Sequence, residues 1–251
     1  MKVPSNFFGI VVKRQRYREK DALVTILTKE YGFKTFLVRG TQGPKSKISG
    51  SVIPFSYGDY SGLVKDEGLS YLNSASNVKQ FDEIIQDIEL NAYATFLFDL
   101  MSNAFLNEVI PDEWYKELFK ALLYIDNGYD AQIVVNILQM HLLKVFGVEP
   151  NMDSCVVGGE KNARFDFSVI LGGLLCSKHF NQDVHRLHLS ERTIYFLRLF
   201  SKISLDQISS INLKDSNKDL IQHAIDSIYI GSVGSYPKSK TFIDNMHTWH
   251  I

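Results

Sequence analysis

The densest group of charged side chains in the sequence lies between residues 13 and 20, where the chain reads Lys-Arg-Gln-Arg-Tyr-Arg-Glu-Lys. Five cations there surround one aromatic ring. Cations neutralise the phosphates of a nucleic acid and aromatic rings stack on its bases, and proteins that bind single strands combine these two effects. The pattern therefore predicts a nucleic-acid contact made by Lys13, Arg14, Arg16, Tyr17, Arg18 and Lys20.

A second cationic group follows in a segment from residue 39 to residue 50 that contains three glycines. Glycine lets a backbone approach phosphates closely, because it carries no Cβ. We expect contacts from Arg39, Lys45 and Lys47. Residues 1–50 hold eleven Lys and Arg against three Asp and Glu, whereas the remaining 201 residues hold 16 against 25. This asymmetry indicates a polyanionic partner, with the acidic remainder of the same chain as the alternative.

Short strands must position both groups, because runs rich in apolar and β-branched residues alternate with turn signals in this part of the chain. The expected strands cover residues 7–13, 22–28, 33–38, 51–60 and 69–72. Five short strands with a long central loop predict an OB-fold β-barrel over residues 1–78, and an SH3-like barrel is the alternative. In an OB fold, the loop between the first two strands lies at the rim of the nucleic-acid groove, where the group at 13–20 falls.

From residue 79 onward the apolar residues recur with a period of 3.6, which predicts an all-α domain over residues 79–251. Helices are expected over 81–100, 114–125, 134–145 and 190–200, and also near 204–210 and 216–230. Residues 148–183 hold both cysteines and are expected to form an irregular insertion. The predicted fold class is therefore α+β, with a barrel domain followed by a helical domain.

Several segments of the sequence resemble the RecO family of bacterial DNA repair proteins. The resemblance rests on Gly9–Gly32, Val38–Lys47, Leu142–Cys155 and Gly172–Cys176, and faintly on Pro237–Phe242. These segments follow one another in order over nearly the whole chain, whereas residues 81–135 are similar only in character. The resemblance implies an N-terminal OB fold, a helical domain and, in many members, a zinc-binding insertion.

The resemblance also implies a function, that of a recombination mediator. Such a protein binds single- and double-stranded DNA, anneals complementary strands, pairs with RecR and helps to load RecA. It also contacts the C-terminal tail of single-stranded-DNA-binding protein. That acidic, apolar tail would need an apolar groove with a cation at its rim, and the candidate cations are Lys144, Arg192 and Arg198. An RNA-binding or ribosome-associated OB module is the alternative function.

The zinc-binding insertion is where the sequence departs from the family. The family pattern resembles two C-x-x-C pairs, but here the first pair reads Cys155-Val-Val-Gly158 and the second reads Cys176-Ser-Lys-His179. A structural zinc ion needs four ligands in a tetrahedron, and only three remain in register. The fourth would have to come from elsewhere, such as His185 or His188. We therefore expect apolar packing and no metal, with a catalytic metal site as the enzyme alternative.

Composition and motifs exclude several classes of protein. Two cysteines are too few for a disulfide scaffold, so we expect a reducing cytoplasm. The resemblance to a DNA repair family implies association with the nucleoid. The apolar runs fall far short of the roughly 18 residues that a membrane helix needs, and the N-terminus lacks the apolar core of a secretory signal. These short apolar runs also lead us to expect no membrane partner. The sequence has neither a Walker A motif nor an H-E-x-x-H motif, so we expect no catalytic residue and no cofactor.

Overall fold

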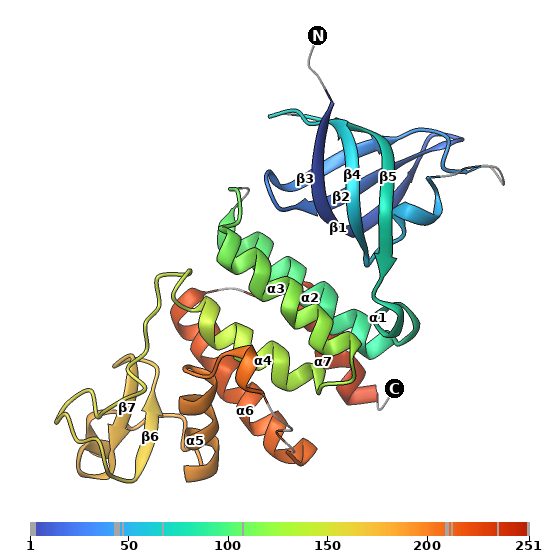
Figure 1. The fold of residues 1–251 in the computed structure, drawn as a ribbon. Helices are drawn as coiled ribbons and strands as arrows, with labels where there is room; N and C mark the ends of the chain where they lie inside the picture. The colour runs from blue at the N-terminus through green and yellow to red at the C-terminus, as the bar shows by residue number, and fades with distance from the viewer. Residues whose placement is uncertain are drawn as a thin grey trace. The chain divides into compact units, whose positions relative to one another are not determined.

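The structure is a computed structural model that describes residues 4–42, 46, 48–66, 68–106, 108–208, 211, 213–234 and 236–249. An N-terminal five-stranded barrel precedes a helical region, as Figure 1 shows, so the expected α+β class is confirmed. By packing, the chain divides into two compact units, Met1–Asn127 with Thr241–Ile251 and Gly128–Lys240. The first unit thus joins the barrel to helices, and the expected domain limits of 1–78 and 79–251 stay a prediction.

The barrel closes in the strand order β1-β2-β3-β5-β4. Its strands are β1 (Ser5–Tyr17), β2 (Asp21–Thr28), β3 (Gly32–Val38), β4 (Ser56–Leu63) and β5 (Ser70–Gln80), with a short 3-10 turn, η1, at Gly50–Val52. Neighbouring strands are antiparallel except for β3 and β5, and β4 pairs with β1 to close the barrel. This Greek-key barrel is the OB fold that the strand pattern predicts.

The last barrel strand is much longer than the sequence pattern predicts. β5 runs eight residues past Leu72, the expected end, and pairs with β4 over most of that length. Its second half is largely exposed, and only Ala75 and Val78 there are apolar and pack against the barrel core. A strand is recognised by alternation between apolar and polar residues, and two apolar residues three positions apart do not give that signal.

Three helices follow the barrel within the first unit. They are α1 (Asp82–Gln86), α2 (Ile88–Phe105) and α3 (Asp112–Asp126), and the C-terminal α7 (Ser239–Trp249) lies mostly in the same unit. The single helix expected over 81–100 is interrupted at Asp87, whose carboxylate accepts the N–H groups of Glu89 and Leu90 and so caps α2. The ring of Phe119 in α3 packs against Phe8 and Tyr57 of the barrel.

The second unit surrounds a helix that is buried on nearly every side, α4 (Ala131–Leu142). Around it lie α5 (Glu191–Phe200) and α6 (Asp215–Ile228), with a 3-10 turn at η3 (Leu205–Gln207) and a π-helical turn at η4 (Tyr229–Val233). The insertion expected to be irregular contains a two-stranded sheet, β6 (Phe165–Ser168) and β7 (Gly173–Cys176), followed by η2 (Ser177–Gln182). Both strands are only four residues long and wholly buried, so they show no alternation. Among the described residues, no helix is long and apolar enough to cross a membrane.

Candidate functional site

The tip of the β1–β2 hairpin carries most of the first cationic group. Tyr17 pairs with Asp21, so Arg18, Glu19 and Lys20 form a three-residue turn. Arg18 adopts a left-handed backbone (φ 56°), and its guanidinium lies 5.2 Å from the centre of the Tyr17 ring. Arg18 and Lys20 are exposed, as are Arg16 and Lys13 on β1, and Tyr17 is half-buried. The hairpin therefore presents exposed cations beside one accessible aromatic ring.

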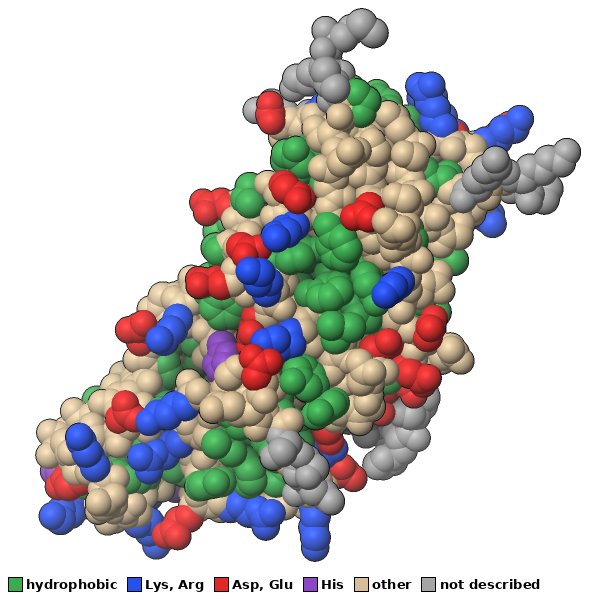
Figure 2. Space-filling model, viewed as in Figure 1, with side chains coloured by type: hydrophobic (Ala, Val, Ile, Leu, Met, Phe, Trp, Pro, Cys, Tyr) green, Lys and Arg blue, Asp and Glu red, His purple; other side chains and the backbone are tan. Residues whose placement is uncertain are grey.

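The segment that follows β3 is tied to the hairpin tip by two hydrogen bonds. The carboxylate of Asp21 accepts the N–H of Gly40 at 3.0 Å, and the Thr41 hydroxyl donates to the Lys20 carbonyl at 3.5 Å. Arg39 is exposed at the start of this segment, so it joins the exposed cations of the hairpin at one end of the barrel. Figure 2 shows a group of Lys and Arg side chains projecting there. Lys45 and Lys47 lie outside the described residues.

Arg14 belongs to the same cluster but has a different environment. Strand register places it opposite the buried Val24, on the inner face of β1. Its guanidinium donates to the carbonyl and hydroxyl of Ser49, at 2.9 and 3.1 Å, and to the Thr41 carbonyl at 3.3 Å. Arg14 therefore holds Thr41 and Ser49 close to β1, which leaves fewer of its N–H groups for a phosphate.

The outer face of the sheet adds residues that the sequence analysis did not select. Strand pairing lines up Gln15, Leu23, Leu37 and Tyr71 in one row across β1, β2, β3 and β5. The ammonium group of Lys65 lies 5.1 Å from the centre of the Tyr71 ring. The sequence gives no signal for this second aromatic–cation pair, because Lys65 is followed by two acidic residues and only strand register assigns Tyr71 to this face.

The second unit contains a cluster of four metal-binding side chains. The ligand atoms of Cys155, Glu160, Cys176 and His179 all lie within 4.8 Å of one another. Cys176 ends β7 and His179 follows in η2, whereas Cys155 and Glu160 close a loop in which the Cys155 N–H donates to the Glu160 carbonyl at 2.8 Å. The sequence analysis expected any fourth ligand to be His185 or His188. It missed Glu160, whose only local signal is a position two residues beyond Gly158.

The spacing of these donor atoms suits a tetrahedral zinc ion. The His179 Nδ1 lies 3.2 Å from Cys176 Sγ, 3.5 Å from Cys155 Sγ and 3.8 Å from Glu160 Oε2. Zn–S bonds of about 2.3 Å and Zn–N or Zn–O bonds of about 2.0–2.1 Å would separate tetrahedral donors by roughly 3.3–3.8 Å. The residues therefore fit the zinc ion that the resemblance implies, and the reason for expecting no metal, a missing fourth ligand, no longer holds.

Backbone groups also favour a thiolate in this cluster. Burial raises the pKa of the Cys155 thiol, but the N–H groups of Gly158, Cys176 and Val157 outweigh it and lower that pKa to about 7. Burial, together with the neighbouring Cys155, raises the pKa of Cys176. Metal ligation requires the thiolate form, so Cys155 is the better prepared of the two sulfur donors.

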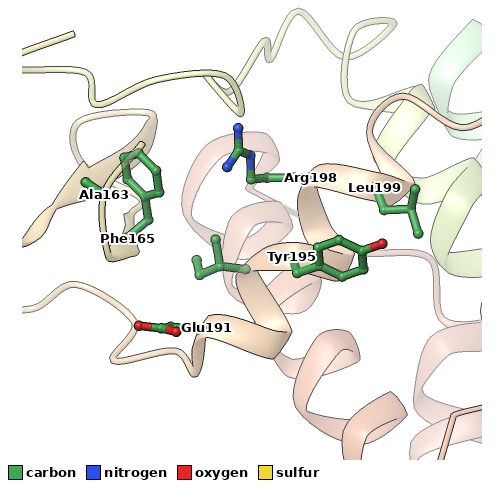
Figure 3. Close-up of a pocket in the computed structure, with 7 residues that line it drawn as sticks. Ala163, Phe165, Glu191, Tyr195, Arg198 and Leu199 are labelled. Carbon is green, nitrogen blue, oxygen red and sulfur yellow. The ribbon is translucent and has the colours of Figure 1, made fainter. Parts of the chain in front are cut away.

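One of the three candidate cations for a protein tail, Arg198, lines a pocket in the second unit (Figure 3). The pocket has a volume of about 360 Å³, and α5 provides Tyr195, Arg198 and Leu199 while Phe165 of β6 faces them. The Arg198 guanidinium lies 5.5 Å from the centre of the Phe165 ring and donates to the Met152 carbonyl at 3.0 Å. The pocket thus combines apolar walls with one cation, whose position is fixed by hydrogen bonding, and one acidic residue, Glu191.

The other two candidate cations occupy different surroundings. Lys144 lines a separate hollow with Lys202. Arg192 is exposed on α5 and does not line the Arg198 pocket. The three cations therefore do not form one site, and only Arg198 combines a positive charge with a mainly apolar surface.

Comparison with known proteins gives matches over nearly the whole chain. Residues 1–81 match the family model described as Recombination protein O N terminal, and residues 85–241 match the one described as Recombination protein O C terminal. The DNA repair protein RecO of Ligilactobacillus salivarius is 44% identical over 242 residues, which cover 96% of this chain and 93% of that protein. The DNA repair protein RecO of Latilactobacillus sakei is 42% identical over 244 residues, covering 97% and 90% respectively.

Proposed function

The chain belongs to the RecO family of DNA repair proteins, and on this premise we propose that it is a recombination mediator that binds single- and double-stranded DNA and catalyses no reaction. The observation that carries the proposal is the junction of the β1–β2 hairpin with the segment after β3. Exposed cations from two parts of the chain converge there at one end of an OB barrel, and they are Lys13, Arg16, Arg18, Lys20 and Arg39. OB folds bind nucleic acids at this kind of loop cluster.

The cations and the aromatic rings would have separate roles. The cations at the barrel end would neutralise phosphates, which gives affinity without sequence preference. Tyr17 at the tip and Tyr71 on the outer sheet face would stack on bases, each with a cation, Arg18 or Lys65, close to the ring. A surface that reads neither base edges nor groove shape is suited to pairing any complementary strands, which supports the annealing role.

Recruitment of protein partners would belong to the second unit. We propose that the Arg198 pocket takes the C-terminal tail of single-stranded-DNA-binding protein, with apolar side chains against Phe165 and Tyr195 and a carboxylate near Arg198. Pairing with RecR and the loading of RecA rest on family membership alone. The same holds for a cytoplasmic, nucleoid-associated location.

The experiment is a DNA-binding and strand-annealing titration at several salt concentrations. The test variant combines Arg16→Ala, Arg18→Ala and Lys20→Ala, and leaves Arg14 in place because it braces the neighbouring segment. If three phosphate contacts are lost, the slope of log K against log salt for a single strand should become less negative by about 2. Affinity should fall by more than about tenfold at low salt.

A matched control removes three exposed lysines of the second unit with Lys161→Ala, Lys214→Ala and Lys238→Ala. This control variant has the same change in net charge as the test variant, and its slope of log K against log salt should equal that of the wild type. Equal effects in both variants would mean that only overall charge matters, which would contradict the proposed interface. Tighter binding to structured RNA than to single-stranded DNA of equal length would favour the RNA-binding alternative.

A further inference from the structure

We propose that Glu160 is the fourth ligand of a zinc ion that this chain also holds through Cys155, Cys176 and His179. In the C-x-x-C pattern that the sequence resembles, a second cysteine would stand at position 158, where this chain has Gly158. Glu160 would supply the ligand that is missing there. This metal site is independent of the DNA-binding function proposed for the barrel, because no residue of the cluster lies in the first unit.

The strongest observation is the space beside Gly158. A Cβ atom built on Gly158 would lie 2.2 Å from Glu160 Oε2 and 2.5 Å from His179 Cε1. The Glu160 carboxylate therefore occupies the place that a cysteine side chain at position 158 would enter. A longer side chain from two residues farther along the chain thus reaches the position of the missing ligand.

The two carboxylate oxygens of Glu160 face different partners. Oε2 lies 3.5 Å from Cys176 Sγ and 3.8 Å from His179 Nδ1, inside the cluster. Oε1 lies 3.7 Å from the ammonium group of Lys178, on the outer side. This division leaves one oxygen directed at the metal while the other is held by a cation, as outer partners of ligating carboxylates commonly do.

The donor set identifies the metal and its role. Two sulfurs, one imidazole nitrogen and one carboxylate oxygen suit zinc, which accepts all three ligand types in a tetrahedron. With four protein donors the site has no open position for water or substrate, so the ion would be structural. It would join the 155–160 loop, the end of β7 and the η2 turn, in a region whose only strands are four residues long.

The test measures zinc in the full-length chain purified from zinc-supplemented medium, and measures affinity by competition with a chromophoric chelator. Wild type should contain one zinc per chain. Glu160→Ala should weaken zinc binding by more than about 100-fold, which is beyond the loss expected for an outer-sphere partner. His185→Ala and His188→Ala should bind zinc like wild type, since neither belongs to the cluster.

A rescue variant keeps the test decisive if Glu160→Ala folds poorly. Combining Gly158→Cys with Glu160→Ala restores a thiol at the family position and removes the carboxylate that would obstruct it. This double variant should regain stoichiometric zinc, and its Co²⁺ form should show stronger sulfur-to-metal charge-transfer absorption than wild type. The proposal is overturned if wild type holds no zinc, if Glu160→Ala binds zinc as tightly as wild type, or if a His185 or His188 variant loses the metal instead.

Discussion

Arg14 and Arg16 are the same residue type two positions apart on β1, yet the structure gives them different surroundings. Both pair with buried residues of β2, Val24 and Ala22, and so follow the inner face of the strand. The Arg14 side chain is half-buried and donates hydrogen bonds to Ser49 and Thr41, whereas the Arg16 side chain is exposed near the hairpin tip. Equal charge in the sequence therefore does not mean equal availability to DNA.

This difference predicts opposite effects for two single substitutions. Arg14→Ala should destabilise the barrel end by about 1–3 kcal/mol, because it leaves partly buried acceptors on Ser49 and Thr41 without their donor. Arg16→Ala should leave the unfolding midpoint unchanged and make the salt slope for single-stranded DNA less negative by about 0.7. Urea unfolding and salt-dependent titrations measure the two quantities. A larger stability loss for Arg16→Ala than for Arg14→Ala would show that the roles are reversed.

At the scale of elements, strand register determines which side chains share a surface. Tyr71 on β5 lies opposite Leu37 of β3, which in turn lies opposite Leu23 of β2, and all three are half-buried on the outer face. The core residues of the same strands, such as Phe36 and Val38, alternate with them on the inner face. A row assembled from strands that are distant in sequence thus extends the candidate interface away from the hairpin tip.

The outer row predicts a stacking contribution from Tyr71. Tyr71→Leu keeps an apolar side chain but removes the aromatic face, so affinity for single-stranded DNA should fall by about 1–3 kcal/mol while the salt slope stays the same. Fluorescence anisotropy with a labelled oligonucleotide measures both. Tyr195→Leu, on an exposed ring of the second unit, is the control and should change neither. An unchanged affinity for Tyr71→Leu would remove this residue from the interface.

Helix α5 presents a second candidate surface, with Tyr195 and Arg198 on the pocket wall. Tyr195 is 60% exposed, so Tyr195→Ala should not affect folding but should weaken binding of a tail peptide from single-stranded-DNA-binding protein, by roughly 1–3 kcal/mol if the ring is a central contact. Lys144→Ala, in the other hollow, is the comparison. Isothermal titration with the peptide measures both affinities. A loss confined to Lys144→Ala would move the tail to that hollow.

At the scale of the whole molecule, the chain has a net charge of only −1 but distributes it unevenly. The candidate DNA contacts all belong to the first compact unit, and the metal cluster and the Arg198 pocket belong to the second. The proposed DNA-binding surface and the proposed tail-binding pocket therefore belong to different units.

The separation predicts that metal and DNA binding are independent. Removing zinc with a chelator should lower the thermal unfolding midpoint, since the ion would join three segments of the second unit. Affinity for single-stranded DNA and its salt slope should stay unchanged. Chelator already saturated with zinc is the control. A parallel loss of DNA affinity on chelation would show that the cluster contributes to the DNA-binding surface.

Patterns that are local in the sequence were sufficient for the barrel strands and for most of the helices. The OB barrel, the following helices and the family were predicted correctly, because apolar periodicity, turn residues and contiguous segments all lie within short stretches of chain. Features without a local signal were missed. They include the second half of β5, where only Ala75 and Val78 face the core, and α7, which follows a segment with glycine, serine and proline.

The sequence by itself therefore determined the OB barrel, its basic N-terminal segments and the absence of cysteine at positions 158 and 179 of the pattern that it resembles. Only the tertiary structure decided that Arg14 donates hydrogen bonds to Ser49, that Tyr71 lies on the outer face of the sheet and that Glu160 reaches the place of the missing cysteine. The physical reason is the same in each case. Strand register and loop closure bring together atoms that are far apart in sequence, and no residue type or spacing along the chain specifies those distances.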